Sequence, residues 1–538
     1  MKKIVSMLLC LVLLVALFAA CGGNPTPSTA PSAAPSAAPS AAVGDTEVHT
    51  NESDTLYERK TPEDSVVLAV DQEPDNLDPA ECQLVHAWAL TSAIYDNLIT
   101  MDPETGEYVN QLAESVEYTD DLTLEIKIKS GIQFSNGTPL TAEDVMYTFQ
   151  HMANSSRFSS NFACIDFENS TVNDETSLTV KMLNPYAPFL AYVAHPACGI
   201  ISKAYVEEVG EDTFARNPMG SGPFTFVKWD SGDRVELTRN DAYWGEKPAY
   251  KTVVMRFITE ATTRMIEFET GGVDIATNLA SADIERMKNG EVSNATLYTI
   301  VSENMNRLGL LDSFEPFKDY RVRQALAHAI DMETVVDVAY GSEGIATGNV
   351  YPSDCKYYEE FPVYEYNPEL AKQLLADAGY ADGLTLTGGA IAGSPDAKAM
   401  EIIQNMLKDV GVTLNFETVD VGTLIGKSLG GEYNFAPLNS TTTSRDPDQA
   451  ISNMKAECPF LLAAVSDAQL NEYFNIGATV VDEVQREEAY KSAAQYIYDN
   501  AITIPICTTV FGDAVRDYVD FYPAYASHII DLRTITFK

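Results

Sequence analysis

The stretch LTLEIKIKSGIQFSNGTPLTAEDVMYTF, residues 122–149, changes its apolar period partway along. Apolar and polar residues alternate over 122–129, which predicts a half-buried strand. Ser-Asn-Gly at 135–137 predicts a turn, and Thr141 with Asp144 three residues later predicts the capped start of a helix. We expect this strand, turn and helix to serve the architecture, because they contain no catalytic constellation.

The amino terminus has the pattern of a bacterial export signal. Lys2 and Lys3 precede an apolar run over 7–20, which is too short for a comfortable membrane span. The sequence LFAACG around Cys21 is similar to the lipobox, in which the signal is cut before a cysteine that is then acylated. We therefore expect a signal peptide at 1–20 and lipidation at Cys21. The mature protein would be anchored to the cell membrane on its extracytoplasmic face, at the cell surface or in the periplasm.

A low-complexity segment follows this cysteine. The tetrapeptide PSAA occurs three times in succession, starting at positions 31, 35 and 39. Proline and small residues bury too little apolar surface to fold, so we expect 21–65 to be a disordered linker without secondary structure. The linker would act as a stalk that lets a folded body move near the membrane.

The rest of the chain, 66–538, has the composition of an acidic globular body. The formal net charge of the chain is −43, and 45% of its residues are hydrophobic. A surface this acidic repels phosphate groups, so nucleic acid is excluded as a partner. The length exceeds that of one simple core and predicts two or three lobes.

The cysteines are scattered and include no C-x-x-C pair, which argues against a zinc site. An exported protein can form one or two disulfides, and Cys355 with Cys458 is one candidate pair. The alternative is that the cysteines of the body are buried free thiols; these are Cys82, Cys164, Cys198, Cys355, Cys458 and Cys507.

Strands and helices alternate along the body. The apolar periods predict strands at 66–70, 177–183, 234–240 and 252–258, and helices at 87–99, 319–339, 367–379 and 397–411. This interleaving without a repeat of fixed period places the protein in the α/β class.

Five segments of the body carry recognisable motifs. They are LDP at 77–79 with YDNLI at 95–99, IKIKSGIQFSNGTPLTAEDV within the opening stretch, NPMGSGPFTFVKWDSGDRVELTRNDAYW at 217–244, DYRVRQALAHAID at 319–331, and YNPELAKQLLADAGY at 366–380. Together, and in this order, they resemble the family 5 extracellular solute-binding proteins, which are peptide and nickel receptors of ATP-driven importers. The segment IKIKSGIQFSNGTPLTAEDV carries the most specific resemblance.

The resemblance implies a periplasmic-binding-protein-like clamshell of two lobes and three subdomains, of the large cluster C type. Subdomain I would take 66–98, 219–305 and 506–538. Subdomain II, an insertion, would take 99–218, and subdomain III, the second lobe, would take 306–505. The ligand would lie in the cleft between the lobes and be buried when the hinge closes.

The resemblance also suggests one wall of the ligand site. In peptide-binding relatives the segment after LDP pairs with the ligand backbone like an added strand. This places Gln83, Leu84 and Val85 at the ligand, with His86 beside them. Trp88 is expected to belong to a helix core.

The second expected wall lies within YNFAPLNSTTTSRDPDQAI, residues 433–451. The residues expected to contribute to it are Tyr433, Asn439, Ser440, Thr441, Thr442, Thr443, Ser444, Arg445 and Asp446. Relatives tend to carry a Trp and then an Asp just before the D-P-like step, and in oligopeptide receptors that Asp binds the α-ammonium of the ligand.

This chain departs from that pattern. Ser440 stands at the Trp position and Thr443 at the Asp position, so we expect Thr443 not to hold a free peptide amino terminus in the usual way. Asp446 or Asp448 could substitute if the loop shifts. Arg445 could meet a ligand carboxylate or could pair with one of these two aspartates.

The implied function is that of a receptor and not of an enzyme. The chain has no G-x-S-x-G, H-E-x-x-H or phosphate-loop motif, and we expect no cofactor. The resemblance implies a monomer that captures a peptide-like solute and delivers it to the permease and ATPase subunits of an ABC importer. A receptor for a nickel chelate or an oligosaccharide, and a solute sensor without transport, are the alternatives. His86, His195 and His328 are present for nickel, but no pair has ligand spacing.

Overall fold

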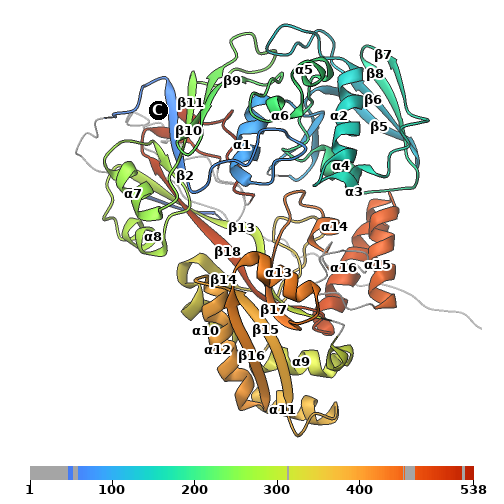
Figure 1. Ribbon diagram of the computed structural model, residues 1–538, viewed down its shortest axis with the longest axis vertical. Coiled ribbons are helices and arrows are strands. Elements are labelled where there is room, and N and C mark those ends of the chain that lie inside the picture. Colours follow the sequence, from blue (N-terminus) through green and yellow to red (C-terminus); the bar gives the residue numbers. More distant parts are fainter. Residues whose placement is uncertain are drawn as a thin grey trace, which may run out of the picture. The chain divides into compact units, whose positions relative to one another are not determined.

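A computed structural model describes residues 46–51, 59–103, 105–311, 314–451, 454, 467–523 and 527–538 (Figure 1). All of them belong to one compact unit, Ala41–Lys538. We use "first lobe" for the described residues of 46–301 and 509–538, and "second lobe" for those of 305–508. The fold is α/β, as the sequence predicts.

A ten-stranded sheet forms the centre of the first lobe and extends into the second. Its main path runs β1-β13-β18-β12-β2-β11-β10-β9, while β14 pairs with β18 and β17 pairs with β13. Strand β2 is buried along its whole length between parallel neighbours, because every residue of SVVLAV packs into the core. The strands are β1 (Thr46–Asn51), β2 (Ser65–Val70), β9 (Phe224–Asp230), β10 (Arg234–Arg239), β11 (Thr252–Phe257), β12 (Ile275–Ala276), β13 (Ala295–Leu310), β14 (Gly344–Ala346), β17 (Phe435–Thr441) and β18 (Ile504–Arg516), with helices α1 (Val85–Ile94), α7 (Ala261–Glu269) and α8 (Ser281–Lys288) beside them.

The range 99–218 contains a second, four-stranded antiparallel sheet in the order β5-β6-β8-β7. The predicted strand and helix of the opening stretch are β6 and α2. The Asp144 carboxylate accepts the backbone N–H of Thr141 at 2.9 Å, as predicted for the start of α2. The elements are β3 (Ile99–Met101), β4 (Tyr108–Asn110), β5 (Ala113–Asp120), β6 (Thr123–Ile128), β7 (Thr171–Asp174), β8 (Ser177–Lys181), α2 (Ala142–Asn154), α3 (Ser159–Phe162), α4 (Phe189–Val193), α5 (Lys203–Val209) and α6 (Glu211–Phe214).

The second lobe is built on the parallel pair β15–β16, with helices packed around it and the helix pair α15–α16 to one side (Figure 1). The single helix predicted at 319–339 is wrong. The structure has two helices there, because the Asp331 carboxylate accepts the N–H of Thr334 and starts a new helix. The elements are α9 (Tyr320–Ala329), α10 (Met332–Ala339), α11 (Pro368–Asp377), β15 (Leu384–Ile391), α12 (Pro395–Asp409), β16 (Val412–Val419), α13 (Val421–Leu429), α14 (Pro447–Ala450), α15 (Ala468–Thr479) and α16 (Glu483–Asp499), with short 3-10 turns at Glu315–Lys318 and Gly341–Glu343. The small pair β19 (Val519–Phe521) and β20 (Thr536–Phe537) lies near the carboxyl terminus.

Two long neighbouring strands, β13 and β18, pass from one lobe into the other (Figure 1). Their pairing is regular up to Val301 and resumes at Met305, so the residues between them interrupt the ladder where the lobes meet. One of these, Glu303, is 1% exposed, and neither of its carboxylate oxygens has a hydrogen-bond partner among the described residues. We refer to residues 302–304 as the hinge segment.

The disordered linker expected over 21–65 does not hold for residues 46–51. Residues Thr46–Asn51 form β1, which pairs antiparallel with Ala295–Ile300 at the edge of the large sheet. The alternating TEVHTN sequence suits an edge strand. Its backbone hydrogen bonds come from β13, a distant segment, so the composition of the linker could not indicate this strand. The range 1–45, with Cys21, lies outside the described residues.

The described cysteines Cys82, Cys164, Cys198, Cys355 and Cys507 are buried free thiols. Cys458, the proposed partner of Cys355, lies outside the described residues. Among the helices that the structure describes, none is both long and apolar enough to cross a membrane.

Candidate ligand-binding cleft

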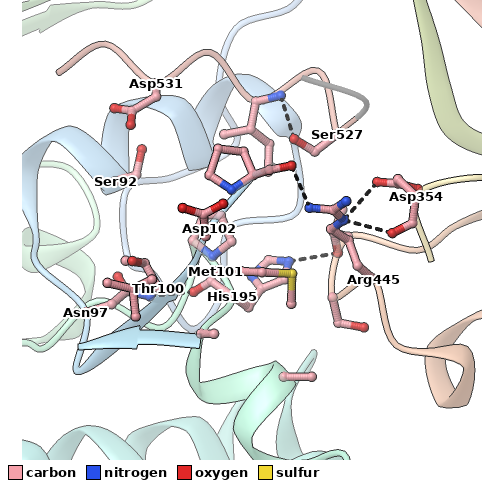
Figure 2. Close-up of a pocket in the computed structure, with 18 of the residues that line it drawn as sticks. Ser92, Asn97, Thr100, Met101, Asp102, His195, Asp354, Arg445, Ser527 and Asp531 are labelled. Carbon is pink, nitrogen blue, oxygen red and sulfur yellow. Dashed lines mark hydrogen bonds and ion pairs between the residues drawn. The ribbon is translucent and has the colours of Figure 1, made fainter. Parts of the chain in front are cut away.

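A cavity of about 570 Å³ lies between the two lobes (Figure 2). The first lobe contributes residues of α1 and the following turn, of β3 and the loop after it, of α4 and its end, and of the carboxyl-terminal segment. The second lobe contributes two short loops. The lining residues are Ser92, Asn97, Thr100, Met101, Asp102, Pro103, Val109, Ala191, Ala194, His195, Pro196, Ser527, Ile529, Asp531, Arg533 and Thr534 from the first lobe, and Ser353, Asp354, Thr443, Ser444 and Arg445 from the second.

Charges of both signs line this cavity. In the first lobe, Arg533 Nε lies 2.7 Å from Asp531 Oδ1, and Arg533 Nη2 donates to Asp531 Oδ2 at 2.8 Å. Burial alone would raise the pKa of Asp531, but the guanidinium of Arg533 lowers it, so this carboxylate stays charged. The cleft can therefore accommodate a solute with both charged and polar groups.

Arg445 joins the two lobes across the cavity. Its Nε lies 3.2 Å from Asp354 Oδ2 in its own lobe, and its Nη1 donates to the carbonyl of Pro103 in the first lobe at 3.2 Å (Figure 2). Arg445 has a φ of +52°, which is uncommon for a residue other than glycine. The backbone thus holds an unfavourable conformation that directs this guanidinium across the cleft.

His195 and Thr443 form a second contact between the lobes. His195 Nε2 lies 2.8 Å from Thr443 Oγ1, and both side chains are buried. Burial, with the nearby Arg157, lowers the pKa of His195 well below its usual value, so the imidazole is neutral. This contact therefore joins two uncharged groups.

Two further hydrogen bonds connect the first lobe to the second. The backbone N–H of Ala187 donates to the carbonyl of Ala478 at 2.8 Å. The hydroxyl of Tyr186 donates to Asp448 Oδ2 at 3.3 Å. With the contacts of Arg445 and Thr443, they show that the cavity lies between lobes that touch each other.

The first predicted wall lies outside this cavity. The N–H of Gln83 donates to Asp75, Leu84 precedes the first turn of α1, and Val85 begins that helix. His86 is buried and pairs with Asp71 at 2.6 Å. Farther along the same segment, Ser92 and Asn97 line the cavity instead. Trp88 is buried in the core, as predicted, and its Nε1 donates to the carbonyl of Cys82.

The second predicted wall meets the cavity at Thr443, Ser444 and Arg445. Asp446 does not line it, because both of its carboxylate oxygens accept from Arg486 Nη2, at 2.8 and 2.7 Å. Asp448 receives the hydroxyls of Tyr186 and Tyr490. The expectation that Arg445 pairs with Asp446 or Asp448 is wrong, since its carboxylate partner is Asp354.

The residues of that wall that precede Thr443 do not line the cavity, and three of them form hydrogen bonds with other residues of the protein. Arg307 Nη2 donates to Ser440 Oγ at 2.6 Å, and the Thr441 hydroxyl bonds to Asn304. The Tyr433 hydroxyl donates to Glu417 at 2.8 Å. Asn439 is exposed on β17, and Thr442 is buried, but neither lines the cavity.

Sequence reasoning missed several lining residues. Asp531 and Arg533 come from the carboxyl-terminal segment, and Asp354 from a loop of the second lobe. The D-L-R sequence at 531–533 was the available signal, but nothing local to it indicates that it faces the cleft.

The three candidate nickel histidines lie in different environments. His86 pairs with Asp71, His195 with Thr443, and His328 Nδ1 with the carbonyl of Glu365. In the part of the chain that the structure describes, no group of three or more His, Cys, Asp or Glu side chains is arranged to hold a metal ion.

Two α/β lobes that are joined by neighbouring strands and meet around a cavity are the arrangement of a solute-binding protein. The family model for "Bacterial extracellular solute-binding proteins, family 5 Middle" matches residues 107–459, and the chain belongs to this family. The resemblance inferred from the sequence, and the clamshell fold it implied, are thereby confirmed.

Individual relatives agree with this assignment. The glutathione-binding protein GsiB of Escherichia coli O1:K1 / APEC is 26% identical over 461 residues, which cover 82% of this chain and 88% of GsiB. The structure of HbpA2 from Haemophilus parasuis has a TM-score of 0.79 at 24% identity, covering 88% of this chain and all of that one (100%). The periplasmic binding protein DppA from Helicobacter pylori, in complex with the peptide STSA, has a TM-score of 0.74 at 22% identity and covers 88% and 98%.

Proposed function

We propose that this protein captures a peptide-like solute in the cleft between its lobes and delivers it to the permease of an ABC importer. The observation that carries the proposal is the cavity of about 570 Å³ between the lobes, to which both lobes contribute charged and hydroxyl side chains. Sites for small molecules typically occupy about 300–1,000 Å³. The cavity therefore suits a short peptide or a similar solute.

The chemistry of the lining supports a peptide-like ligand. Arg445 and Arg533 can attract a carboxylate, and Asp531 can attract an amino group, while Asn97 offers an amide. A relative named for glutathione is similar in sequence, and a protein solved in complex with a peptide has a similar fold. The contacts between the lobes provide the closing step that buries the solute.

The proposed location and partners follow from the sequence. A lipid at Cys21 would anchor the protein on the extracytoplasmic face, and residues 21–45 would connect the anchor to the folded body. The net charge of −43 would keep that body away from anionic lipid. The protein would act as a monomer without a cofactor. It would do no covalent chemistry, and separate ATPase subunits would supply the energy for import.

Native mass spectrometry of the full chain, purified in detergent, tests this proposal. A tight site often retains its ligand, since nanomolar affinity corresponds to roughly −12 kcal/mol. We expect bound masses that fit short peptides or peptide-like solutes. A bound oligosaccharide or nickel chelate would replace the peptide assignment, and normal peptide uptake in cells that lack the protein would favour a sensor without transport.

A further inference from the structure

Thr443 lines the cavity, and its hydroxyl lies between two hydrogen-bonding side chains. His195 Nε2 is 2.8 Å from Thr443 Oγ1, and Gln449 Nε2 is 3.2 Å from the same oxygen. Whether Thr443 offers the ligand a donor or an acceptor depends on whether His195 and Gln449 each donate to its hydroxyl oxygen or accept its proton. Other hydrogen bonds of His195 and Gln449 determine which they do.

The protonation of His195 is fixed by its other ring nitrogen. The backbone N–H of Ala197 donates to His195 Nδ1 at 3.0 Å, so Nδ1 carries a lone pair and not a proton. In a neutral imidazole the proton must then be on Nε2. His195 therefore donates to Thr443 Oγ1.

The orientation of the Gln449 amide is fixed in the same way. The backbone N–H of Ser444 donates to Gln449 Oε1 at 2.8 Å, which identifies the amide oxygen and leaves the NH₂ group facing Thr443. Gln449 therefore also donates to Thr443 Oγ1.

A threonine hydroxyl has two lone pairs and one proton. His195 and Gln449 use both lone pairs of Thr443, and among the described residues none accepts the Thr443 proton. Thr443 lines the cavity, so this proton is available to whatever occupies it. An ammonium group, which has only donors, would meet a donor here.

The neighbouring groups do not compensate for this. Arg445, two residues along the chain, also lines the cavity and is positively charged, and the nearby Asp354 carboxylate is already paired with it, 3.2 Å from its Nε. The carboxylate of Asp446 is bound to Arg486, and that of Asp448 receives two tyrosine hydroxyls. An amine placed at Thr443 would lie beside donors and a cation.

We propose that Thr443 donates a hydrogen bond to an oxygen of the ligand, and that the ligand is a peptide-like solute whose amino end is acylated. The carbonyl of the acyl group would accept from Thr443. This inference rests on the proposed function, because it identifies the end group of a solute in the same cleft. If the ligand bound in the opposite orientation, its terminal carboxylate could accept the same hydrogen bond. The test therefore distinguishes an acylated amino end from a free carboxyl end.

The test uses four forms of one randomised tripeptide library, with a free or acetylated amino end and with a free or amidated carboxyl end. Binding to the purified full chain is measured by competition and native mass spectrometry. We expect acetylated peptides to bind more tightly than free-amine peptides, by roughly tenfold. We expect this preference to persist when the carboxyl end is amidated.

Three variants connect this preference to Thr443. In Thr443→Asp the side chain can only accept hydrogen bonds. The ratio of the dissociation constants for acetylated and free-amine peptides should therefore invert and favour free amines. Thr443→Ser keeps the hydroxyl and should keep the preference. Thr413→Asp adds the same charge at an exposed position of β16 and should leave the ratio unchanged. The ratio is compared within each variant, so a general loss of stability does not alter it.

Three outcomes would overturn the inference. Tighter binding of free-amine peptides by the unmodified protein would overturn it while leaving peptide binding intact. A preference that disappears on amidation would assign Thr443 to a carboxylate. Failure of all four libraries to bind would overturn the proposed function, and the inference with it.

Discussion

Arg486 Nη2 lies 2.8 Å from Asp446 Oδ1 and 2.7 Å from Asp446 Oδ2, and both side chains are buried. Arg486 Nε also donates to the carbonyl of Gly477 at 2.7 Å. The guanidinium thus ties the start of α14 to the end of α15 and to α16. The loop that carries Thr443 and Arg445 to the cleft is held in place by this pair.

Replacing Arg486 with Met should destabilise the protein strongly. The change leaves the Asp446 carboxylate buried without its charge partner, which typically costs about 3–5 kcal/mol. Urea unfolding measures the change in the free energy of unfolding. Lys491→Met removes a surface ion pair with Glu487 on the same helix and should cost less than about 1 kcal/mol. Equal losses in the two variants would contradict the structural role of Arg486, and adding Asp446→Asn should recover part of its loss.

The pH dependence of stability should depend on His195. Burial and Arg157 lower its pKa in the folded protein, whereas the unfolded chain binds a proton near pH 6.5. The unfolded state then binds more protons, so the free energy of unfolding falls as the pH drops below about 6.5, by up to ~1.4 kcal/mol per pH unit. His195→Gln cannot bind this proton. We expect a flatter dependence between pH 5 and 7 in the variant, and parallel curves would refute the expectation.

Glu303→Gln should stabilise the protein at neutral pH. Burial, followed by the Asp354 carboxylate, raises the pKa of Glu303 well above its usual value, although Arg445 opposes the shift. The folded protein therefore holds a proton that the unfolded chain releases above about pH 4.3, and stability falls as the pH rises beyond that value. Glutamine keeps the shape without the acid. We expect a gain of about 1 kcal/mol or more at pH 7, measured by urea unfolding.

A matched substitution controls for the change in net charge. Glu401→Gln alters an exposed side chain on α12 and should change the free energy of unfolding by less than about 0.5 kcal/mol. If Glu303→Gln destabilises the protein at pH 7, the Glu303 carboxylate is charged and paired, contrary to its buried environment.

Strand β1 should protect the edge of the large sheet. It is short and polar, and it covers Ala295–Ile300 of β13, where Leu297 and Ile300 are buried. Without β1, the next strand would expose unpaired backbone groups that favour pairing with another chain. A chain that begins at Arg59 should self-associate, whereas one that begins at Thr46 should remain monomeric. Light scattering after size exclusion compares the two, and a monomer in both cases would show that β1 is dispensable.

The sequence predicted elements well where the signal is local. The period change and the Thr141–Asp144 pair located β6 and α2, because cap and alternation depend on neighbouring residues. It failed at Asp331, where a polar side chain divides one apolar helical pattern into two helices. The apolar residues on either side continue the same period, so the break was hidden.

The cleft was predicted only in part for a similar reason. Thr443, Ser444 and Arg445, which line the cavity, stand in a loop that carries a recognisable pattern, and their role at the ligand stays a prediction. Asp354 and Arg533 reach the cavity through pairings between residues far apart in the chain, which no local pattern encodes. Asp446 looked available in the sequence, but its buried partner Arg486 is 40 residues away.

The two lobes are connected through neighbouring, hydrogen-bonded strands that are interrupted together at the hinge segment. Such a paired connection restricts twisting and favours rotation about a single axis. One interlobe distance would then report the state of the whole molecule. Fluorescent dyes attached to the thiols of Leu183→Cys and Val481→Cys, two exposed positions that flank the Ala187–Ala478 hydrogen bond, would convert the protein into an optical sensor for its own solute.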